Sequence, residues 1–178
     1  GDPEAKKIWQ KCVEVSLKEF ERIYRLLNIK IDFVYGESFY HQKVKKVISE
    51  AQRKGITAES EGALIVPLTG FKTPLMLLKG DEGTTYHARD LAAIKFRLEK
   101  WRPVLMIYEV GADQKLHFQQ LFSAVELLSW AKKTQFVHLA HGLIRWQGGK
   151  FSTRKGSTIH LAEVLKEAIR RAQKIISA

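Results

Sequence analysis

The chain has 178 residues, which fits one ordinary domain or one domain with a small appendage. Hydrophobic residues make up 45% of it and the mean hydropathy is −0.21, which argues against a disordered tail, and its apolar runs are too short to span a membrane. The net charge of +11 and the pI near 9.8 favour an anionic partner such as nucleic acid, with simple solubility as the alternative. Cys12 is the one cysteine, which rules out an internal disulfide framework and is compatible with a cytoplasmic location.

The first part of the chain predicts helices and short strands. Asp2 can cap a first helix, Pro3 suits its first position, and Asn28 can close its far end. The elements are expected in this order: helix 3–27, strand 31–35, helix 39–54, and strands 63–67 and 74–78. A turn cluster at 80–83 predicts a boundary, so we expect a small α+β subdomain over 1–82.

The second part, 83–178, predicts alternating strands and helices. The elements are expected in this order: strand 84–86, helix 88–101, strand 104–110, helix 114–131, strand 136–139, a glycine-flanked loop 148–156 and helix 161–176. Alternating elements with continuous apolar strands are typical of a parallel sheet covered by helices on both faces. The predicted fold class is therefore α/β.

Three side chains are candidates for a ligand site, because ligands of open parallel sheets bind beyond the carboxyl ends of the strands. Tyr86 and Asp90 lie four residues apart at a predicted strand-to-helix junction, and Gln114 follows the strand 104–110. A carboxylate, an aromatic ring and an amide together suit a planar cation such as guanidinium. In the alternative interpretation, Asp90 pairs with a neighbouring arginine and Tyr86 is a half-buried residue that only packs against its neighbours.

The loop 148–156 has glycines at both ends and a basic, hydroxyl-rich centre. Its cations and hydroxyls are suited to binding phosphate; they are Lys150, Ser152, Thr153, Arg154 and Lys155. A solvated surface hairpin is the alternative. A Walker A loop is excluded, because Phe151 stands where a hydroxyl residue is required and Ile144 where the first glycine is required.

The histidines predict no metal site. His138 and His141 are three residues apart, but no nearby cysteine and no second cluster supports zinc. His117 follows Gln114 by one helical turn and could face the same crevice; the alternative is that it is a helix-cap or packing residue.

Several segments in order resemble arginyl-tRNA synthetases of class I. The family's tyrosine-x-x-arginine-aspartate segment is matched by 84–90, and its strand-end turn by 111–118. The family's strand before the signature loop is matched by 138–144, and its version of the "KMSKS" loop by 149–156. The segments 1–5 and 35–38 resemble the stretch that enters and crosses the insertion between the two Rossmann halves. The resemblance thus covers nearly the whole chain, and it implies a partial Rossmann-like sheet.

The resemblance implies a role for each matched position in an arginine–tRNA ligase, with arginine, ATP and tRNA as partners. Arginine would be held by Tyr86, Asp90 and Gln114. ATP, accompanied by Mg²⁺, would lie near His117, Gly142, Lys150, Phe151, Ser152 and Thr153. Transition-state charge would be stabilised by Lys150, Ser152, Arg154 and Lys155. No protein-bound metal is implied.

Some features depart from the generic class I pattern. Phe151 replaces the usual methionine, and Thr153 stands where the second lysine would be, as is common in arginyl enzymes. The segment 138–142 does not match the HxGH motif, which in the family lies in the first Rossmann half. We therefore expect the N-terminal half-site and the C-terminal anticodon-binding domain to be missing, and the chain alone to be inactive. The alternative is a non-catalytic truncated relative that binds RNA or protein; another class I synthetase fits less well, because an apolar pocket would not contain a carboxylate.

Overall fold

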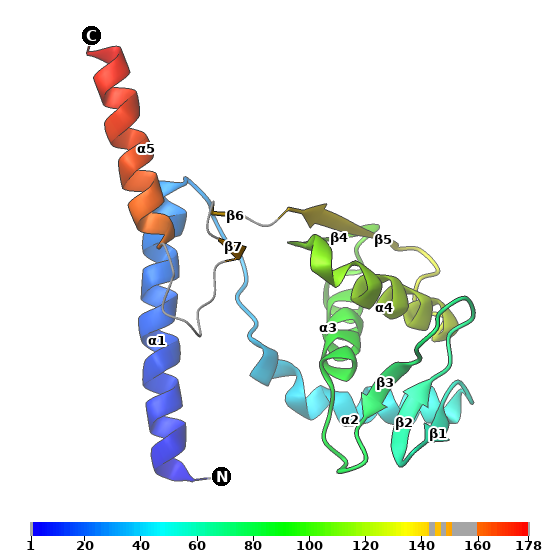
Figure 1. The fold of residues 1–178 in the computed structure, drawn as a ribbon. Helices are drawn as coiled ribbons and strands as arrows, with labels where there is room; N and C mark the ends of the chain where they lie inside the picture. Colours follow the sequence, from blue (N-terminus) through cyan, green and yellow to red (C-terminus); the bar gives the residue numbers. More distant parts are fainter. Residues whose placement is uncertain (1, 143–144, 147–148, 151–159, 178) are drawn as a thin grey trace. The chain divides into compact units, whose positions relative to one another are not determined.

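The computed structural model describes residues 2–142, 145–146, 149–150 and 160–177, as Figure 1 shows. By its internal contacts the chain divides into two units, one formed by 1–34 with 145–178 and the other by 35–144. In the part of the chain that is described, no helix has the length and apolar character needed to cross a membrane.

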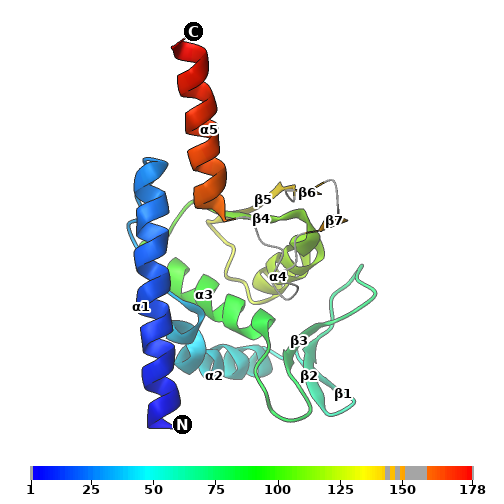
Figure 2. The same ribbon diagram turned by 60° about the vertical axis from the view of Figure 1, so that its left-hand side comes forward.

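Within the unit 35–144, a helix precedes a small antiparallel sheet. The helix α2 spans Glu37–Arg53, and the strands β1, β2 and β3 span Ala58–Ser60, Ala63–Val66 and Leu75–Leu78. The strands pair in the order β1-β2-β3, and Figure 2 shows the long connection between β2 and β3 projecting from the sheet. Leu75 and Leu77 are buried while Met76 between them is exposed, so β3 has the period-2 pattern of a sheet with one covered face.

The same unit contains a two-stranded parallel sheet with helices. The helices α3 and α4 span Tyr86–Trp101 and Lys115–Leu127, the strands β4 and β5 span Leu105–Gly111 and Gln135–His141, and the 3₁₀ helix η1 spans Ala112–Gln114. Leu105 pairs with Gln135 and Gly111 with His141, so the carboxyl ends of both strands lie at one edge. The prediction of an α/β fold with a small Rossmann-like parallel sheet is confirmed.

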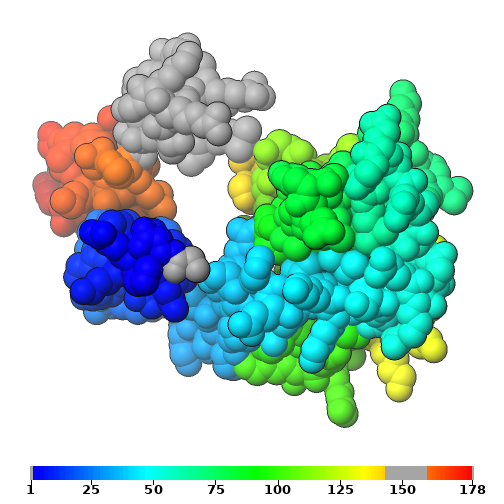
Figure 3. All heavy atoms as spheres, turned by 90° about the horizontal axis from the view of Figure 1, so that it is seen from below, coloured from blue at the N-terminus to red at the C-terminus, as the bar shows by residue number. Residues whose placement is uncertain are grey.

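The core of this unit lies where α2, α3 and α4 pack with β3. Its largest fully buried side chains are Val44, Val47, Val66, Leu75, Leu77, Leu91, Ile94, Leu121, Val125 and Leu128. The space-filling view in Figure 3 shows α2, in cyan, packed against the green segment of α3. Complete burial of one such aliphatic side chain contributes about 1.5–3 kcal/mol, so this cluster fixes the helices that carry the candidate site.

Glu50 joins three parts of the unit at the border of the core. Its carboxylate accepts hydrogen bonds from Lys95 Nζ at 2.7 Å and Trp130 Nε1 at 2.9 Å. Burial by itself raises the pKa of Glu50, but these hydrogen bonds and the charges of Lys95 and Lys54 outweigh it and lower the pKa to about 2. The group therefore stays ionised and holds α2 to α3.

The unit formed by the two ends of the chain contains two helices and a short hairpin. The helix α1 spans Pro3–Leu26, α5 spans Leu161–Ile176, and β6 (Arg145–Trp146) pairs antiparallel with β7 (Gly149–Lys150). The predicted caps of α1 are confirmed: Asp2 Oδ1 accepts from the Glu4 amide at 2.9 Å, and Asn28 at φ 53° ends the helix. Neither helix has a buried residue.

Some predicted elements were wrong in detail. Residues 31–35 form no strand, because no neighbouring strand in the described part of the chain pairs with them. The predicted strand 84–86 is reduced to one bridge between Leu78 and Thr84, since α3 already begins at Tyr86. The helix predicted over 114–131 ends at Leu127, and β1 was not predicted. The division of the chain into a subdomain over 1–82 and a second part over 83–178 remains a prediction from the sequence.

Candidate functional site

A cavity of about 590 Å³ opens between the starts of α2, α3 and α4 in the unit 35–144. It is lined by Glu37, Tyr86, His87, Asp90, Asp113, Gln114, Leu116, His117 and Gln120. The structure thus brings together the three residues that the sequence selected for a planar cation, together with His117. Tyr86 and Asp90 come from α3, while Gln114 and His117 come from η1 and α4 at the carboxyl end of β4.

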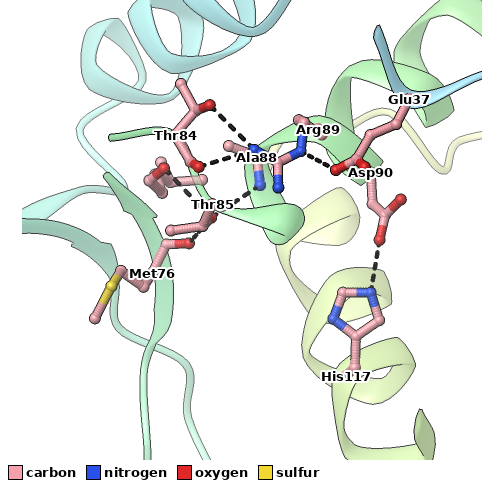
Figure 4. Close-up of polar contacts among 9 residues, drawn as sticks. Glu37, Met76, Thr84, Thr85, Ala88, Arg89, Asp90 and His117 are labelled. Atoms are coloured by element: carbon pink, nitrogen blue, oxygen red, sulfur yellow. Dashed lines mark hydrogen bonds and ion pairs between the residues drawn. The ribbon is translucent and has the colours of Figure 1, made fainter. Parts of the chain in front are cut away.

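The start of α3 is fixed by Thr85, as Figure 4 shows. Thr85 is the N-cap: its hydroxyl accepts a hydrogen bond from the Ala88 amide at 3.3 Å and donates one to the Met76 carbonyl of β3 at 2.6 Å. Thr85 is buried, so these bonds are shielded from water. They lock the first turn of α3, and with it Tyr86 and Asp90, to the antiparallel sheet.

Arg89 binds away from Asp90. Its guanidinium forms an ion pair with Glu37 and donates to the Thr84 carbonyl at 2.9 Å and the Thr84 hydroxyl at 3.2 Å. The alternative in which Asp90 pairs with a neighbouring arginine is therefore wrong for this structure. Arg89 ties α2 to the start of α3 and leaves the Asp90 carboxylate available.

His117 is the protein partner of Asp90. Its Nε2 lies 2.7 Å from Asp90 Oδ2, and the side chain of His117 is 9% exposed whereas that of Asp90 is 46% exposed. The imidazole ring lies among other rings, with centroids 4.6 Å from His87, 5.0 Å from Tyr86 and 5.1 Å from Phe118. These contacts leave the ring little freedom to reorient.

His87 is a buried neighbour of this pair. Burial, and then the nearby imidazole of His117, lower the pKa of His87 to about 4, although the Asp90 carboxylate opposes the shift. Its Nε2 atom is buried and has no hydrogen-bond partner in the described part of the chain. At neutral pH the ring is therefore an uncharged wall of the cavity.

The polar lining of the cavity is acidic. Three carboxylates, those of Glu37, Asp90 and Asp113, line it. The charge of Glu37 is offset by its ion pair with Arg89, whereas no described lysine or arginine pairs with Asp90 or Asp113. Tyr86 is 56% exposed, so its ring is available to a ligand rather than being packed in the core. In a chain with a net charge of +11, this local concentration of negative charge favours a cationic ligand.

The histidines of β5, and Gly142 after it, lie outside the lining of this cavity. His138 Nε2 lies 3.0 Å from the Val110 carbonyl oxygen, and its ring stacks on Phe118 with centroids 4.6 Å apart. His141 Nδ1 lies 3.1 Å from the Gly142 carbonyl oxygen, and Gly142 is exposed next to the carboxyl end of β5. Among the described residues, no group of three or more His, Cys, Asp or Glu side chains is arranged to hold a metal ion.

The basic loop lies largely outside the described residues. The backbone of Lys150 belongs to β7, but its side chain is not described. Phe151, Ser152, Thr153, Arg154 and Lys155 lie outside the described residues altogether. Their phosphate-binding role remains a prediction from the sequence.

Reasoning from the sequence missed two carboxylates of the cavity. Glu37 is held beside the start of α3 by its ion pair with Arg89. The two residues are 52 positions apart, so no local periodicity in the sequence connects them. Asp113 is adjacent to Gln114 in the run that was singled out, and its position after the strand was a signal that could have identified it.

Comparisons with known proteins show which family the chain belongs to. A family model described as "tRNA synthetases class I (R), catalytic domain" matches residues 1–178. The chain belongs to this family. A similar protein, described as "Arginine--tRNA ligase", from Clostridioides difficile (strain 630) is 42% identical over 179 residues, which cover 100% of this chain and 32% of that protein. Another protein of that description, from Exiguobacterium sp. (strain ATCC BAA-1283 / AT1b), is 44% identical over 174 residues, which cover 97% of this chain and 31% of that protein.

Solved structures show the same relationship. The arginyl-tRNA synthetase of Plasmodium falciparum matches with a TM-score of 0.85 and 28% identity, over 99% of this chain and 29% of that one. The Thermus thermophilus arginyl-tRNA synthetase matches with a TM-score of 0.66 and 21% identity, over 98% of this chain and 39% of that one, and this likeness supports the fold alone. The chain therefore spans only about a third of the length of its curated relatives.

Proposed function

We propose that this chain is part of an arginine–tRNA ligase and that its acidic cavity binds the arginine substrate. The observation that carries the proposal is the cavity in which Tyr86, Asp90 and Gln114 meet, lined by three carboxylates in a strongly basic chain. Arginine carries a guanidinium group and an α-ammonium group, so a carboxylate-lined cavity matches its charge. Membership of the family and the names of the relatives agree with this substrate.

Asp90 is the proposed partner of the guanidinium. A carboxylate can accept two parallel hydrogen bonds from a guanidinium group, an arrangement that combines charge with directional specificity. The exposed ring of Tyr86 offers a face or a hydroxyl beside the cation, and the amide of Gln114 offers both a donor and an acceptor. Together these groups would distinguish arginine from lysine, which lacks the planar fork.

ATP and tRNA are the other proposed partners. The loop 148–156 would close over the triphosphate, with Lys150, Arg154 and Lys155 offsetting the charge that develops as the arginine carboxylate attacks the α-phosphorus and pyrophosphate leaves. Mg²⁺ would arrive with ATP, because it binds mainly through phosphate oxygens. Gly142, which is exposed directly after β5, is proposed to lie near the nucleotide. The arginyl group would then pass to tRNA. We propose a cytoplasmic location for the complete protein, and the exposed free cysteine Cys12 is compatible with it.

Replacement of Asp90 by Asn in the complete protein that contains this chain tests the arginine site. Loss of a charge-assisted pair of hydrogen bonds should raise the KM for arginine by roughly 100-fold in a tRNA aminoacylation assay, with the KM for ATP nearly unchanged. Asp81→Asn, which alters an exposed turn carboxylate outside the cavity, is the matched control. Arginine kinetics that do not change in Asp90→Asn would refute the assignment.

Replacement of Lys150 and Lys155 by Ala tests the loop. Removing two donors to the developing charge should slow adenylate formation by roughly 100-fold while the Kd for arginine stays within about twofold of wild type. Lys132→Ala with Lys133→Ala removes the same charge from an exposed turn and controls for nonspecific electrostatics. A large defect in arginine binding with normal adenylate formation would contradict the role of the loop.

A further inference from the structure

The hydrogen bond between His117 and Asp90 joins two helices, and both residues line the cavity. Asp90 belongs to α3 and His117 to α4, and the two residues are 27 positions apart in the chain. The atoms Nε2 and Oδ2 are 2.7 Å apart, a short distance for a hydrogen bond to a carboxylate. No other hydrogen bond or ion pair of Asp90 occurs in the described part of the chain, so Oδ1 remains available to a ligand.

His117 is placed to act on the carboxylate rather than on a ligand. Its side chain is only 9% exposed, so it offers little surface to a nucleotide or an amino acid, while Asp90 is 46% exposed. The ring contacts with Tyr86, His87 and Phe118 hold the imidazole in one orientation. The burial of His117 therefore disfavours the direct nucleotide contact that the family resemblance implied for it.

The tautomer of His117 follows from its surroundings. Nδ1 is buried and has no hydrogen-bond partner among the described residues, so a proton on Nδ1 would be a buried donor without an acceptor. The proton of the neutral ring consequently resides on Nε2, which donates to Asp90 Oδ2. A donor in this position fixes the rotation of the carboxylate.

From these contacts we infer that His117 is a positioning residue for the arginine site: it donates from Nε2 to Asp90 Oδ2 and so holds the carboxylate with Oδ1 available to the guanidinium. This inference rests on the proposed function. Arginine recognition then depends on two hydrogen-bonded residues, Asp90 of α3 and His117 of α4, and not on Asp90 alone. The contribution is geometric, because a carboxylate held in one rotamer loses less conformational freedom when it binds a planar cation.

Two substitutions of His117 separate this role from simple packing. In His117→Gln the side-chain amide nitrogen reaches the position of Nε2 and can still donate to Asp90, whereas in His117→Asn the shorter side chain places it near Nδ1. Both are polar and buried at the same position, so they form a matched pair. The complete protein carrying each change is compared by its circular dichroism, its thermal unfolding midpoint and its aminoacylation kinetics.

The inference predicts a selective effect on arginine. His117→Asn should raise the KM for arginine by roughly 10-fold or more, with kcat and the KM for ATP within about threefold of wild type, and His117→Gln should restore most of the loss. In an Asp90→Asn background, His117→Asn should add no further change, because the group that it positions is already altered.

The outcomes distinguish this inference from the proposed function. If Asp90→Asn raises the KM for arginine but both His117 variants behave as wild type, the positioning role is refuted and the arginine site stands. If Asp90→Asn has no effect on arginine, the proposed site itself fails. A rise in the KM for ATP in the His117 variants, or additive effects with Asp90→Asn, would overturn the inference in favour of a direct nucleotide contact. If His117→Asn does not fold, His117→Phe, which keeps a buried ring but cannot donate to Asp90, takes its place in the same comparisons.

Discussion

At the scale of single residues, the cavity combines charged and uncharged groups that differ in their exposure. Asp90 is half-exposed and ionisable, while His87 and His117 lie behind it with buried nitrogen atoms that lack partners in the described part of the chain. Buried polar atoms without partners are costly, and they persist mainly where a site requires them. The protonation of the buried His87 is therefore linked to the stability of the fold.

His87 gives this linkage a measurable sign. The pKa of His87 is lowered from 6.5 to about 4, first by burial, so between these values the unfolded chain binds a proton that the folded chain does not. The free energy of unfolding should therefore decrease as the pH falls, by roughly 2 kcal/mol between pH 7 and pH 5 from this residue. His87→Gln should remove that part of the pH dependence, as measured by urea denaturation at both pH values.

The exposed His41 supplies the control for this experiment. His41→Gln should leave the pH dependence of wild type in place, because it removes an imidazole that is exposed and lies outside the buried surroundings of His87. Equal pH dependence in wild type and His87→Gln would contradict the account of His87 as a buried neutral ring.

At the scale of elements, the first turn of α3 determines where the site residues lie. Thr85 satisfies the Ala88 amide and binds the Met76 carbonyl, so one hydroxyl joins the helix to β3. Thr85→Ala removes both bonds and should lower the free energy of unfolding by about 1–2 kcal/mol in urea denaturation. Thr85→Ser keeps the hydroxyl and should recover most of that loss.

Thr57 is the matched control for the cap, since it is half-buried and makes no side-chain hydrogen bond in the described part of the chain. Thr57→Ala should change the free energy of unfolding by less than about 0.5 kcal/mol. If Thr85→Ser is as unstable as Thr85→Ala, then the hydroxyl is not what stabilises the first turn.

The elements also show which parts of the fold could be predicted from the sequence. The caps Asp2 and Asn28 act on neighbouring residues, so local chemistry was sufficient to predict them. The apolar segment 31–35 has strand character but forms no strand, because strand formation depends on a partner that local sequence does not provide. The bond between His117 and Asp90 spans 27 residues and could not be predicted from spacing.

At the scale of the whole molecule, a basic chain contains an acidic cavity. The net charge of +11 suits contact with phosphate groups, whereas Asp90 and Asp113 create a local field in the cavity that suits a cation. The two charge distributions match the two kinds of ligand that we propose for the complete protein, tRNA and ATP with their phosphates and the cationic arginine. The family could be identified from the sequence because its motifs are contiguous, while this division of charge required the structure.

We propose that the cavity recognises arginine by its charge. Calorimetric titration of the complete protein tests this with arginine and with citrulline, which has almost the same shape but a neutral ureido group in place of the guanidinium. Arginine should bind, and citrulline should bind at least about 100-fold more weakly, with the difference largely lost in Asp90→Asn. Equal binding of the two ligands by the wild-type protein, or a preference that persists unchanged in Asp90→Asn, would contradict it.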